Sequence, residues 1–315
     1  MENGFGGYHP IVNIIYFASI AVFGMVFRHP VTLILFFAAA ALCYFRFCRG
    51  AAVRSFFTFL MPMLIFVTLI NGLFAHYGIT PVARLPDGNK MTFESVAYGF
   101  VLGLTVISVI MWINCYSETV TTDKFMCVFG KILPGAALVV SMAQRFLPLY
   151  RERLRIIGEA QQSFGADYKH GSIRKRVKSG GKILSVLVTW SLENSVEISN
   201  SMRARGYGLK NATSYGRYRL AVRDIVVLSV IIILDIFLFV GAALKELYCS
   251  YNPCVIINPP SQSGKSYFIN ELNMTINPLS GVGIMTVVSF AVLCFLPLVI
   301  DISEDIRWNK SVSGM

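Results

Sequence analysis

Six apolar runs constrain this chain more than any other feature of its sequence. Each has spanning or near-spanning length and few or no charges, as expected of a helix that crosses a lipid bilayer. The runs cover residues 11–27, 31–47, 56–76, 96–116, 225–244 and 281–300. The first two are short and are separated only by Arg28, His29 and Pro30, which fits either two crossings or one shallow hairpin. The sequence therefore predicts an all-α, polytopic membrane protein with about six transmembrane helices.

The net charge of +11 is concentrated in one segment of the 315-residue chain. Between Tyr116 and Arg223 lie 18 of the 28 Lys and Arg residues but only 7 of the 17 Asp and Glu residues. Cytoplasmic connections of membrane proteins carry an excess of Lys and Arg, and this rule explains a basic segment between membrane spans better than nucleic-acid binding does. A short basic loop is expected at Arg46, Arg49 and Arg54, on the same side.

The charge pattern divides the chain into three parts. Residues 1–116 would hold transmembrane helices 1 to 4, residues 117–223 a cytoplasmic domain, and residues 224–315 transmembrane helices 5 and 6. Four crossings before the basic segment and two after it place both termini in the cytoplasm.

The segment from Lys182 to Gly208 is predicted to be a long helix that is apolar at its start and basic at its end. Gly206 and Gly208 provide a stop signal. Ile198, Met202 and Arg205 follow one line at i, i+4 and i+7, whereas Arg203 points elsewhere. Ala204 and Gly206 flank Arg205 with little side chain. This pattern fits a guanidinium offered to a partner, and it also fits a cation that merely stabilises a helix C-terminus.

A second long helix is predicted over residues 123–168. Pro134 fits a first turn and Pro148 is expected to kink the helix. Its closing residues Ile157, Gln161 and Phe164 repeat the i, i+4, i+7 line of the later helix. The basic stretch 169–182 between the two helices is interpreted as a solvated linker near anionic headgroups.

No residue pattern indicates catalysis, a metal or a cofactor. The seven cysteines show no metal-ligand spacing, and Cys249 and Cys254 lie in an expected outer loop where a disulfide is chemically permitted. The SGKS stretch at 263–266 lacks the upstream glycine of a phosphate-binding loop. Asp224 and Asp235 border or enter a span and are interpreted as an interfacial and a bundle-paired acid instead of an ion path. Two functional classes remain open for a membrane protein with this layout. One is a self-contained permease with its own substrate site, and the other is a membrane-embedded transferase or protease.

Several short motifs stand out along the chain: the His29-Pro30 turn, NGLF at 71–74, QRFLPL at 144–149, AQQSFGADY at 160–168 and SMRARGYG at 201–208. Together they resemble the motifs of the transmembrane T component of energy-coupling factor transporters. The resemblance implies a non-catalytic subunit in a prokaryotic cell membrane. It would transmit the motion of two ABC ATPase subunits to a substrate-binding membrane S component, for uptake of a vitamin, another micronutrient or a transition metal ion.

The resemblance also implies roles for particular residues. Each coupling helix of that family ends in a small-Arg-small motif that binds one ATPase subunit. Ala204, Arg205 and Gly206 match this motif, whereas the corresponding positions of the first helix are Ser163, Phe164 and Gly165, with Phe164 in place of the usual arginine. The apolar faces of the coupling helices are expected to hold the S component, through Ile183, Leu187 and Trp190.

Overall fold

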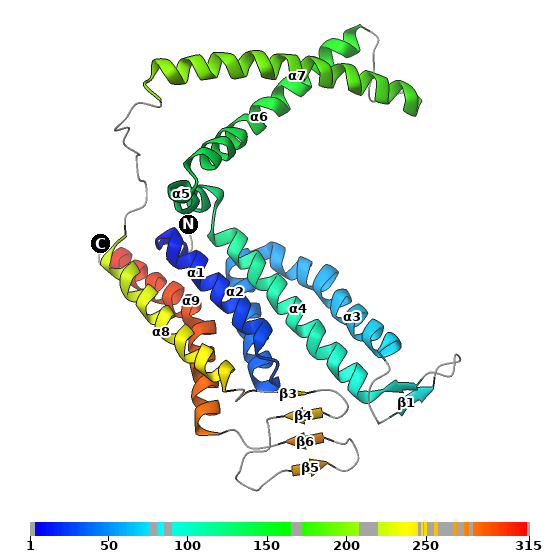
Figure 1. Ribbon diagram of the computed structural model, residues 1–315, viewed down its shortest axis with the longest axis vertical. Coiled ribbons are helices and arrows are strands. Elements are labelled where there is room, and N and C mark those ends of the chain that lie inside the picture. Colours follow the sequence, from blue (N-terminus) through cyan, green and yellow to red (C-terminus); the bar gives the residue numbers. More distant parts are fainter. Residues whose placement is uncertain are drawn as a thin grey trace. The chain divides into compact units, whose positions relative to one another are not determined.

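The computed structural model describes the chain from residue 4 to residue 313, except for residues 76–80, 85–89, 165–171, 208–219, 245–246, 248, 251–254, 258–266, 270–273 and 277–279. Its contacts divide it into two compact units. Unit 1 comprises residues 1–124 and 218–315, and unit 2 comprises residues 125–217. Each unit is described by itself (Figure 1).

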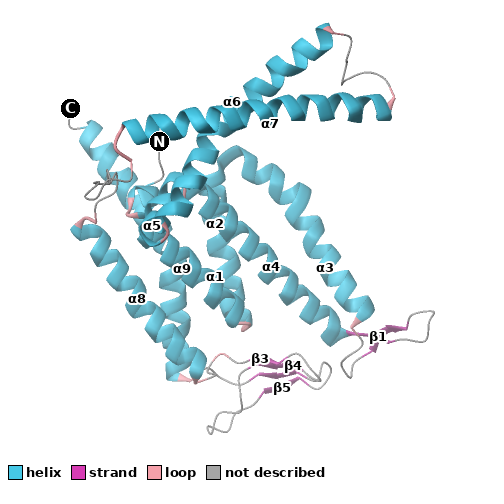
Figure 2. Ribbon diagram, turned by 45° about the horizontal axis from the view of Figure 1, so that its top comes forward, coloured by secondary structure: helices cyan, strands magenta, loops and turns pink. Residues whose placement is uncertain are grey.

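Unit 1 is a bundle of apolar helices. Its helices are the 3-10 helix η1 (Gly4–Gly7), α1 (Pro10–Val26), α2 (Pro30–Ser55), the π-helical turn η2 (Phe56–Leu60), α3 (Met61–Phe74), α4 (Phe93–Thr119), α8 (Val222–Ala243) and α9 (Gly281–Ser313). Helix α5 (Thr122–Ile132) begins in unit 1 and ends in unit 2. Helices α2 and α3 both pack against α4, as the views in Figures 1 and 2 show.

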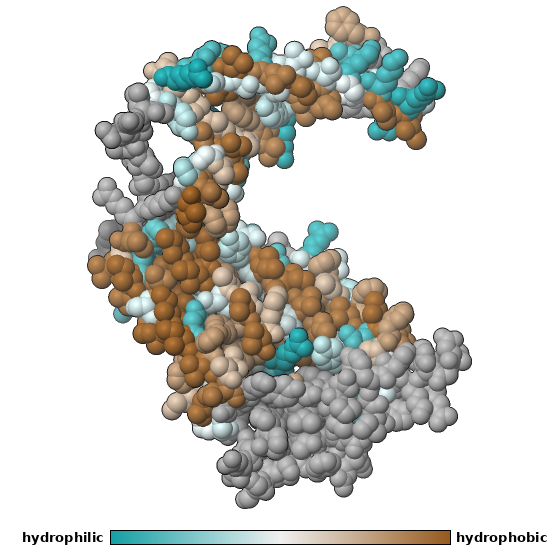
Figure 3. Space-filling view, viewed as in Figure 1, coloured by the Kyte–Doolittle hydropathy of each residue, from teal (hydrophilic) through white to brown (hydrophobic). Residues whose placement is uncertain are grey.

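Five helices of the described chain are long and apolar enough to cross a membrane. These segments are Pro30–Cys48, Ala52–Phe74, Phe93–Thr119, Val222–Ala243 and Gly281–Arg307. Helix α1 is apolar as well, but its 17 residues extend only about 25 Å, which is less than the roughly 30 Å of a bilayer core. Apolar side chains cover much of the outer surface of these helices, as expected for a surface in contact with lipid (Figure 3). The all-α, polytopic membrane fold is confirmed.

Short strands lie in the two connections at one end of the helices of unit 1 (Figure 1). Strands β1 (Pro81–Arg84) and β2 (Lys90–Thr92) form an antiparallel hairpin between α3 and α4. Between α8 and α9, strands β3 (Cys249–Ser250), β4 (Val255–Ile257), β5 (Tyr267–Ile269) and β6 (Met274–Ile276) form a sheet in the order β3-β4-β6-β5. Strands β4 and β6 are parallel and the other pairs are antiparallel. The helical sequence patterns gave no indication of these strands.

Two glycines allow α3 and α4 to approach closely. A Cβ atom at Gly99 would lie 2.7 Å from Asn71 Cβ and 3.1 Å from the carbonyl oxygen of Thr68, so a larger residue does not fit without a shift of α3. Gly103, one turn later, faces Leu64 and Thr68 of the same helix. Helices surrounded by lipid gain little free energy from burying apolar side chains. Small residues four positions apart instead allow close contact between the helix backbones, and this packing holds the helices together.

An aromatic cluster fills the interior of unit 1. Trp112 of α4 is buried, and its ring lies 6.1 Å from those of Tyr16 and Phe17 and 6.3 Å from that of Phe36. Phe5 of η1 is also fully buried, with its ring 5.2 Å from that of Tyr16. These contacts hold the N-terminal turn inside the bundle, because removing large rings from such a core is costly.

Polar side chains join the elements of unit 1 at the end opposite the strands. Asp301 of α9 accepts hydrogen bonds from the Gly4 N–H at 2.8 Å and from Arg46 Nε at 2.9 Å. Arg46 also pairs with Asp305. Lys124 Nζ, which is buried, donates to the carbonyl oxygens of Gly6 and Thr119, both at 2.8 Å.

Three predicted boundaries differ from the structure. The basic loop expected at Arg46, Arg49 and Arg54 is helical, because α2 continues to Ser55 and η2 leads directly into α3. The single helix predicted over residues 123–168 is instead two helices, α5 and α6 (Pro134–Ser163), which are separated at Leu133 because Pro134 begins a new first turn. Residues 165–168 of that prediction lie outside the described residues. The basic linker 169–182 is helical from Ile173, where α7 (Ile173–Ala204) begins, since Arg and Lys favour helices. The assignment of 117–223 as a cytoplasmic domain stays a prediction.

Replacing Asp301 with alanine is expected to destabilise unit 1. The side chain of Asp301 is 6% exposed, and its loss leaves the Gly4 N–H and the Arg46 guanidinium without their shared acceptor, at a cost of about 1–3 kcal/mol. Thermal unfolding in mild detergent measures the effect. Asp305→Ala is the matched control, since Asp305 pairs with the same Arg46 but is 59% exposed, and we expect it to cost less than about 1 kcal/mol. Equal loss of stability in the two variants would contradict this interpretation.

Candidate docking site on two crossed helices

Helices α6 and α7 of unit 2 cross near their middles, and each extends beyond the crossing on both sides (Figures 1 and 2). They contain 30 and 32 residues, so each is about 45 Å long or more. Pro134 lies in the first turn of α6, as predicted, and Pro148 lies inside the helix.

Two aromatic rings and a guanidinium meet at the crossing. The Trp190 ring of α7 meets the Tyr150 ring of α6 edge to face, with ring centroids 5.8 Å apart. The Arg153 guanidinium lies over the same indole, 4.8 Å from its centroid, in a cation–π arrangement. Gly158 of α6 is buried and Gln161 is half-buried. The indole is therefore held by an aromatic ring and a cation from α6, a pair of contacts that the sequence patterns did not indicate.

One face of α7, here called the covered face, is less exposed than the rest of the helix, and at Ile183 and Trp190 it meets α6. Its residues recur at helical spacing, and they are buried or half-buried: Ile183, Leu187, Trp190, Asn194, Ile198 and Met202. The three residues expected to hold the S component, Ile183, Leu187 and Trp190, all belong to this covered face. Ile183 is buried, and it lines a cavity of about 460 Å³ with Leu154, Gly180 and Leu184.

Another face of α7 carries apolar side chains that remain exposed. Leu184, Val188, Leu192 and Val196, here called the exposed stripe, follow one another at i, i+4 spacing. Leu192 is 64% exposed. Single exposed apolar residues are ordinary on a helix surrounded by water. A contiguous row of them is unusual there, and such a surface marks an interaction site.

The tip of α7 is closed by a hydrogen-bonded turn. The Tyr207 N–H donates to the Met202 carbonyl and the Gly206 N–H to the Arg203 carbonyl, both at 3.0 Å. Gly206 has φ of 81°, a left-handed conformation that favours glycine. These are the two bonds of a Schellman motif, and they confirm Gly206 as the stop signal of the helix.

Arg205 lies within this turn, at the end of α7. Its side chain is exposed and forms no ion pair with any residue that the structure describes. Ile198 and Met202, on the line predicted to lead to Arg205, are half-buried, and Ala204 is exposed beside it. Arg203 is exposed as well.

The tip of α6 offers an aromatic ring instead of a cation. Phe164 is the residue that caps α6, and it is 85% exposed. The Ser163 hydroxyl donates to the Glu159 carbonyl at 3.1 Å, so it is engaged within the helix. Gly165, the third residue of this predicted motif, lies outside the described residues. The two tips lie on opposite sides of the crossing (Figure 1).

Ion pairs fix the charged section of α6 before its tip. Arg155 pairs with Glu152 at 2.6 Å and with Glu159 at 3.0 Å, one turn away on either side. The hydrogen bond from Arg155 lowers the pKa of the Glu152 carboxyl below its ordinary value. All three side chains are more than half exposed, so the pairs orient the surface more than they stabilise the fold.

The two acids of α8 in unit 1 have structural partners. Asp224 accepts a hydrogen bond from the Ala221 N–H at 2.9 Å and thereby caps α8. Asp235 accepts from the Ser19 hydroxyl of α1 at 2.6 Å. Cys249 lies in β3, and its candidate disulfide partner Cys254 lies outside the described residues. Asp224 thus closes the first turn of its own helix, whereas Asp235 joins α8 to α1.

Comparison with known proteins assigns the family. The family model CbiQ, described as cobalt transport protein, matches residues 8–215. The energy-coupling factor transporter transmembrane protein EcfT of Bacillus selenitireducens is 29% identical over 199 residues, which are 60% of this chain and 72% of that protein. EcfT of Bacillus subtilis is 32% identical over 201 residues, 58% of this chain and 75% of that protein.

A relative of a different description matches a similar length of this chain. It is a putative ABC transporter ATP-binding protein of Bifidobacterium longum, 26% identical over 185 residues, which are 55% of this chain but only 24% of that protein. The family model alone covers well over half of the chain. The chain therefore belongs to the CbiQ family, as a transmembrane T component of an energy-coupling factor transporter.

Proposed function

We propose that this chain transmits ATP-driven movement from two ABC ATPase subunits to a separate membrane protein that binds the substrate. The observation that carries the proposal is the crossed helix pair of unit 2, whose two exposed tips lie on opposite sides of one contact. Unit 2 and both termini would lie in the cytoplasm, where the excess of Lys and Arg favours them. The chain would act in a prokaryotic cell membrane and would need no catalytic residue of its own.

The crossed helices would work as levers. From Trp190 at the crossing to Ala204 at the tip, α7 extends 14 residues, or about 20 Å. When ATP draws two ATPase subunits together, tips seated in them would move, and the helices would turn about the contact of Trp190 with Tyr150 and Arg153. The opposite halves of the helices would then carry the bound membrane protein with them.

Arg205 would bind the first ATPase subunit. An exposed guanidinium offers five N–H donors in a planar fork that matches carboxylates. The Schellman turn holds the backbone of this residue in one conformation, so little entropy is lost when the partner closes around it. Ala204 and Gly206 on either side leave room for the surface of that partner.

Phe164 would bind the second ATPase subunit. An exposed phenyl ring is a typical anchor for an apolar pocket and a poor partner for carboxylates. The subunit at the α6 tip is therefore expected to offer an apolar pocket where the subunit at the α7 tip offers acids.

The substrate-binding membrane protein would lie on the exposed stripe of α7. Of the three residues first expected to hold that protein, Trp190 contacts Tyr150 of α6 and Ile183 lines a cavity with Leu154 of α6, so these two are already partly engaged. Leu184, Val188, Leu192 and Val196 are exposed and form an apolar row suited to a membrane-embedded protein. The substrate would be a vitamin, another micronutrient or a transition metal ion, and its selection would belong to that partner.

Replacing Arg205 with glutamate is expected to abolish binding of one ATPase subunit. The acidic partner would face a like charge, and losing a desolvated charge pair costs about 2–5 kcal/mol. The amount of each ATPase chain that co-purifies with the variant measures the effect. Arg203→Glu is the matched control, because it makes the same charge change two residues away. Equal co-purification with the two variants would remove Arg205 from this role.

Phe164→Ala is expected to weaken binding of the other ATPase subunit by about 2 kcal/mol, as for an aromatic anchor in a desolvated pocket. Thermal stability should be unchanged, since a ring that is 85% exposed adds little to the fold. Subunit affinity and melting temperature are measured on the same purified variants. Tighter binding by Phe164→Arg would show that the facing surface is acidic, and unchanged affinity in Phe164→Ala would refute the anchor.

Leu192→Glu is expected to prevent assembly with the substrate-binding membrane protein while leaving unit 2 folded. The carboxylate would have to be buried in an apolar interface without a partner. Trp190→Ala is the comparison, because it removes the crossing contact and should lower the melting temperature instead. Co-purification and thermal melting of both variants separate the two faces of α7. Normal assembly of Leu192→Glu would exclude the exposed stripe as the docking surface.

A further inference from the structure

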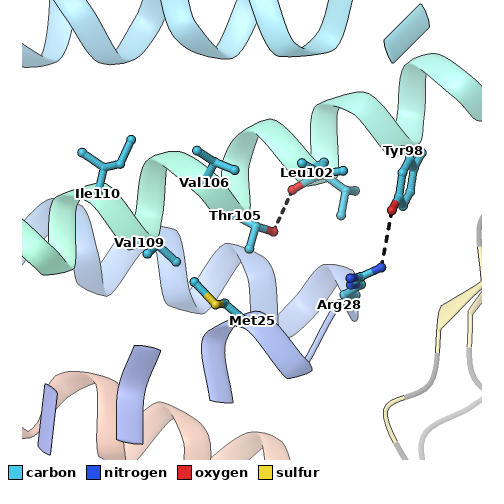
Figure 4. A pocket seen from close by; sticks show the side chains of 9 residues that line it. Met25, Arg28, Tyr98, Leu102, Thr105, Val106, Val109 and Ile110 are labelled. Atoms are coloured by element: carbon cyan, nitrogen blue, oxygen red, sulfur yellow. Dashed lines mark hydrogen bonds between the residues drawn. The ribbon is translucent and has the colours of Figure 1, made fainter. Parts of the chain in front are cut away.

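A groove runs along α4 in the wall of unit 1, beside the C-terminal end of α1 (Figure 4). Its volume is about 390 Å³. The wall is apolar over most of its length, with Met25 from α1 and Leu102, Val106, Val109 and Ile110 from α4. The groove is therefore a continuous apolar surface along α4, a helix that is long enough to cross the membrane.

The polar groups of the groove gather at one end. Arg28 is exposed, and its Nη1 donates to the Tyr98 hydroxyl at 3.4 Å (Figure 4). The one hydroxyl further along, that of Thr105, donates to the Val101 carbonyl of its own helix at 2.8 Å and so does not need a ligand. None of the described residues that line the groove is acidic. A ligand would thus meet a cation and a phenol at one end and hydrocarbon along the rest.

The dimensions of the groove distinguish between possible occupants. Tyr98 and Ile110 are 12 residues apart on α4, which corresponds to about 18 Å. Spread over that length, 390 Å³ gives a mean cross-section of about 20 Å². A partner helix is about 10 Å across, or roughly 80 Å² in section, and is much too wide. A single hydrocarbon chain is narrow enough.

The position of the groove fits one leaflet of the bilayer. Arg28 lies in the short connection between α1 and α2, and Tyr98 lies in the second turn of α4. Arg and Tyr at such positions meet the headgroup region, whereas Val106 and Ile110 lie near the middle of α4. A headgroup at Arg28 would place an attached chain along the apolar wall toward the bilayer centre.

We propose that this groove binds one anionic phospholipid, with its phosphate at Arg28 and Tyr98 and one acyl chain along α4. Positive charge at Arg28 and the lack of an acidic lining residue favour an anionic headgroup over a zwitterionic one. The apolar wall holds the chain irrespective of the headgroup. This site is independent of the coupling role proposed for unit 2, because none of its residues belongs to that unit.

Native mass spectrometry of the full chain, released from nanodiscs of equimolar phosphatidylglycerol and phosphatidylcholine with identical acyl chains, tests the proposal. One retained lipid per chain is expected, with phosphatidylglycerol preferred. One basic residue near an anionic surface contributes about a fivefold preference, so Arg28→Gln should lower the preference by that factor. Arg28→Lys should keep most of it.

Two further variants keep the proposal falsifiable. Arg54→Gln removes an exposed cation from the other end of α2 and should leave the preference unchanged. Val106→Trp should fill the groove and reduce retention of both lipids. If Arg28→Gln and Arg54→Gln lose the preference for phosphatidylglycerol equally, the preference comes from diffuse attraction to positive charge and not from this site. Full retention of the lipid in Val106→Trp would place it elsewhere, and either result would overturn the proposal.

Discussion

The contact between α6 and α7 is the interaction on which the geometry of unit 2 depends. Trp190 is held there between the Tyr150 ring and the Arg153 guanidinium, and among the described elements α6 and α7 pack closely only against each other. An isolated helix is only marginally stable in water, so long helices that share one contact need other surfaces to hold them. The apolar residues left exposed on α7, such as Leu184 and Leu192, are the surface that a partner would cover. Unit 2 is in this sense a helix pair whose packing is completed by assembly.

Unit 1 is organised on a different principle. Gly99 and Gly103 bring α3 and α4 into backbone contact, Trp112 and its aromatic neighbours fill the interior, and Asp301 binds the Gly4 N–H and Arg46 at one end. Each of these contacts joins separate elements of the unit, so a movement of one helix strains several others. Unit 1 therefore has the packing of a rigid body, whereas the exposed tips of unit 2 are free to follow a partner.

The sequence predicted what the bilayer and the backbone dictate directly. Apolar runs reveal the membrane spans because their length must match the bilayer, and Gly206 marks the end of α7 because its left-handed conformation favours glycine. The start of α7 was missed because Arg174 and Arg176 indicate a solvated linker by charge although both favour helices. The strands in the two loops were missed because pieces of two to four residues carry too little pattern. The covered face of α7 could not be chosen either, because apolar residues occupy more than one side of the helix, and only the position of α6 decides which of them are buried.

The unlike tips of α6 and α7 have a consequence for assembly under the proposed coupling role. An arginine placed in an apolar pocket would lose its hydration without gaining an acceptor, and a phenyl ring placed against carboxylates would desolvate those charges without pairing them. Each tip would therefore bind poorly to the ATPase surface that fits the other tip. Interfaces obtain specificity in this way, from unfavourable contacts with the wrong partner as well as favourable contacts with the right one. With Arg205 at the tip of α7 and Phe164 at the tip of α6, the ATPase pair would be accepted in one orientation. Such discrimination has a use only if the two ATPase surfaces differ, so the tip chemistry of this chain favours two non-identical ATPase subunits over two copies of one.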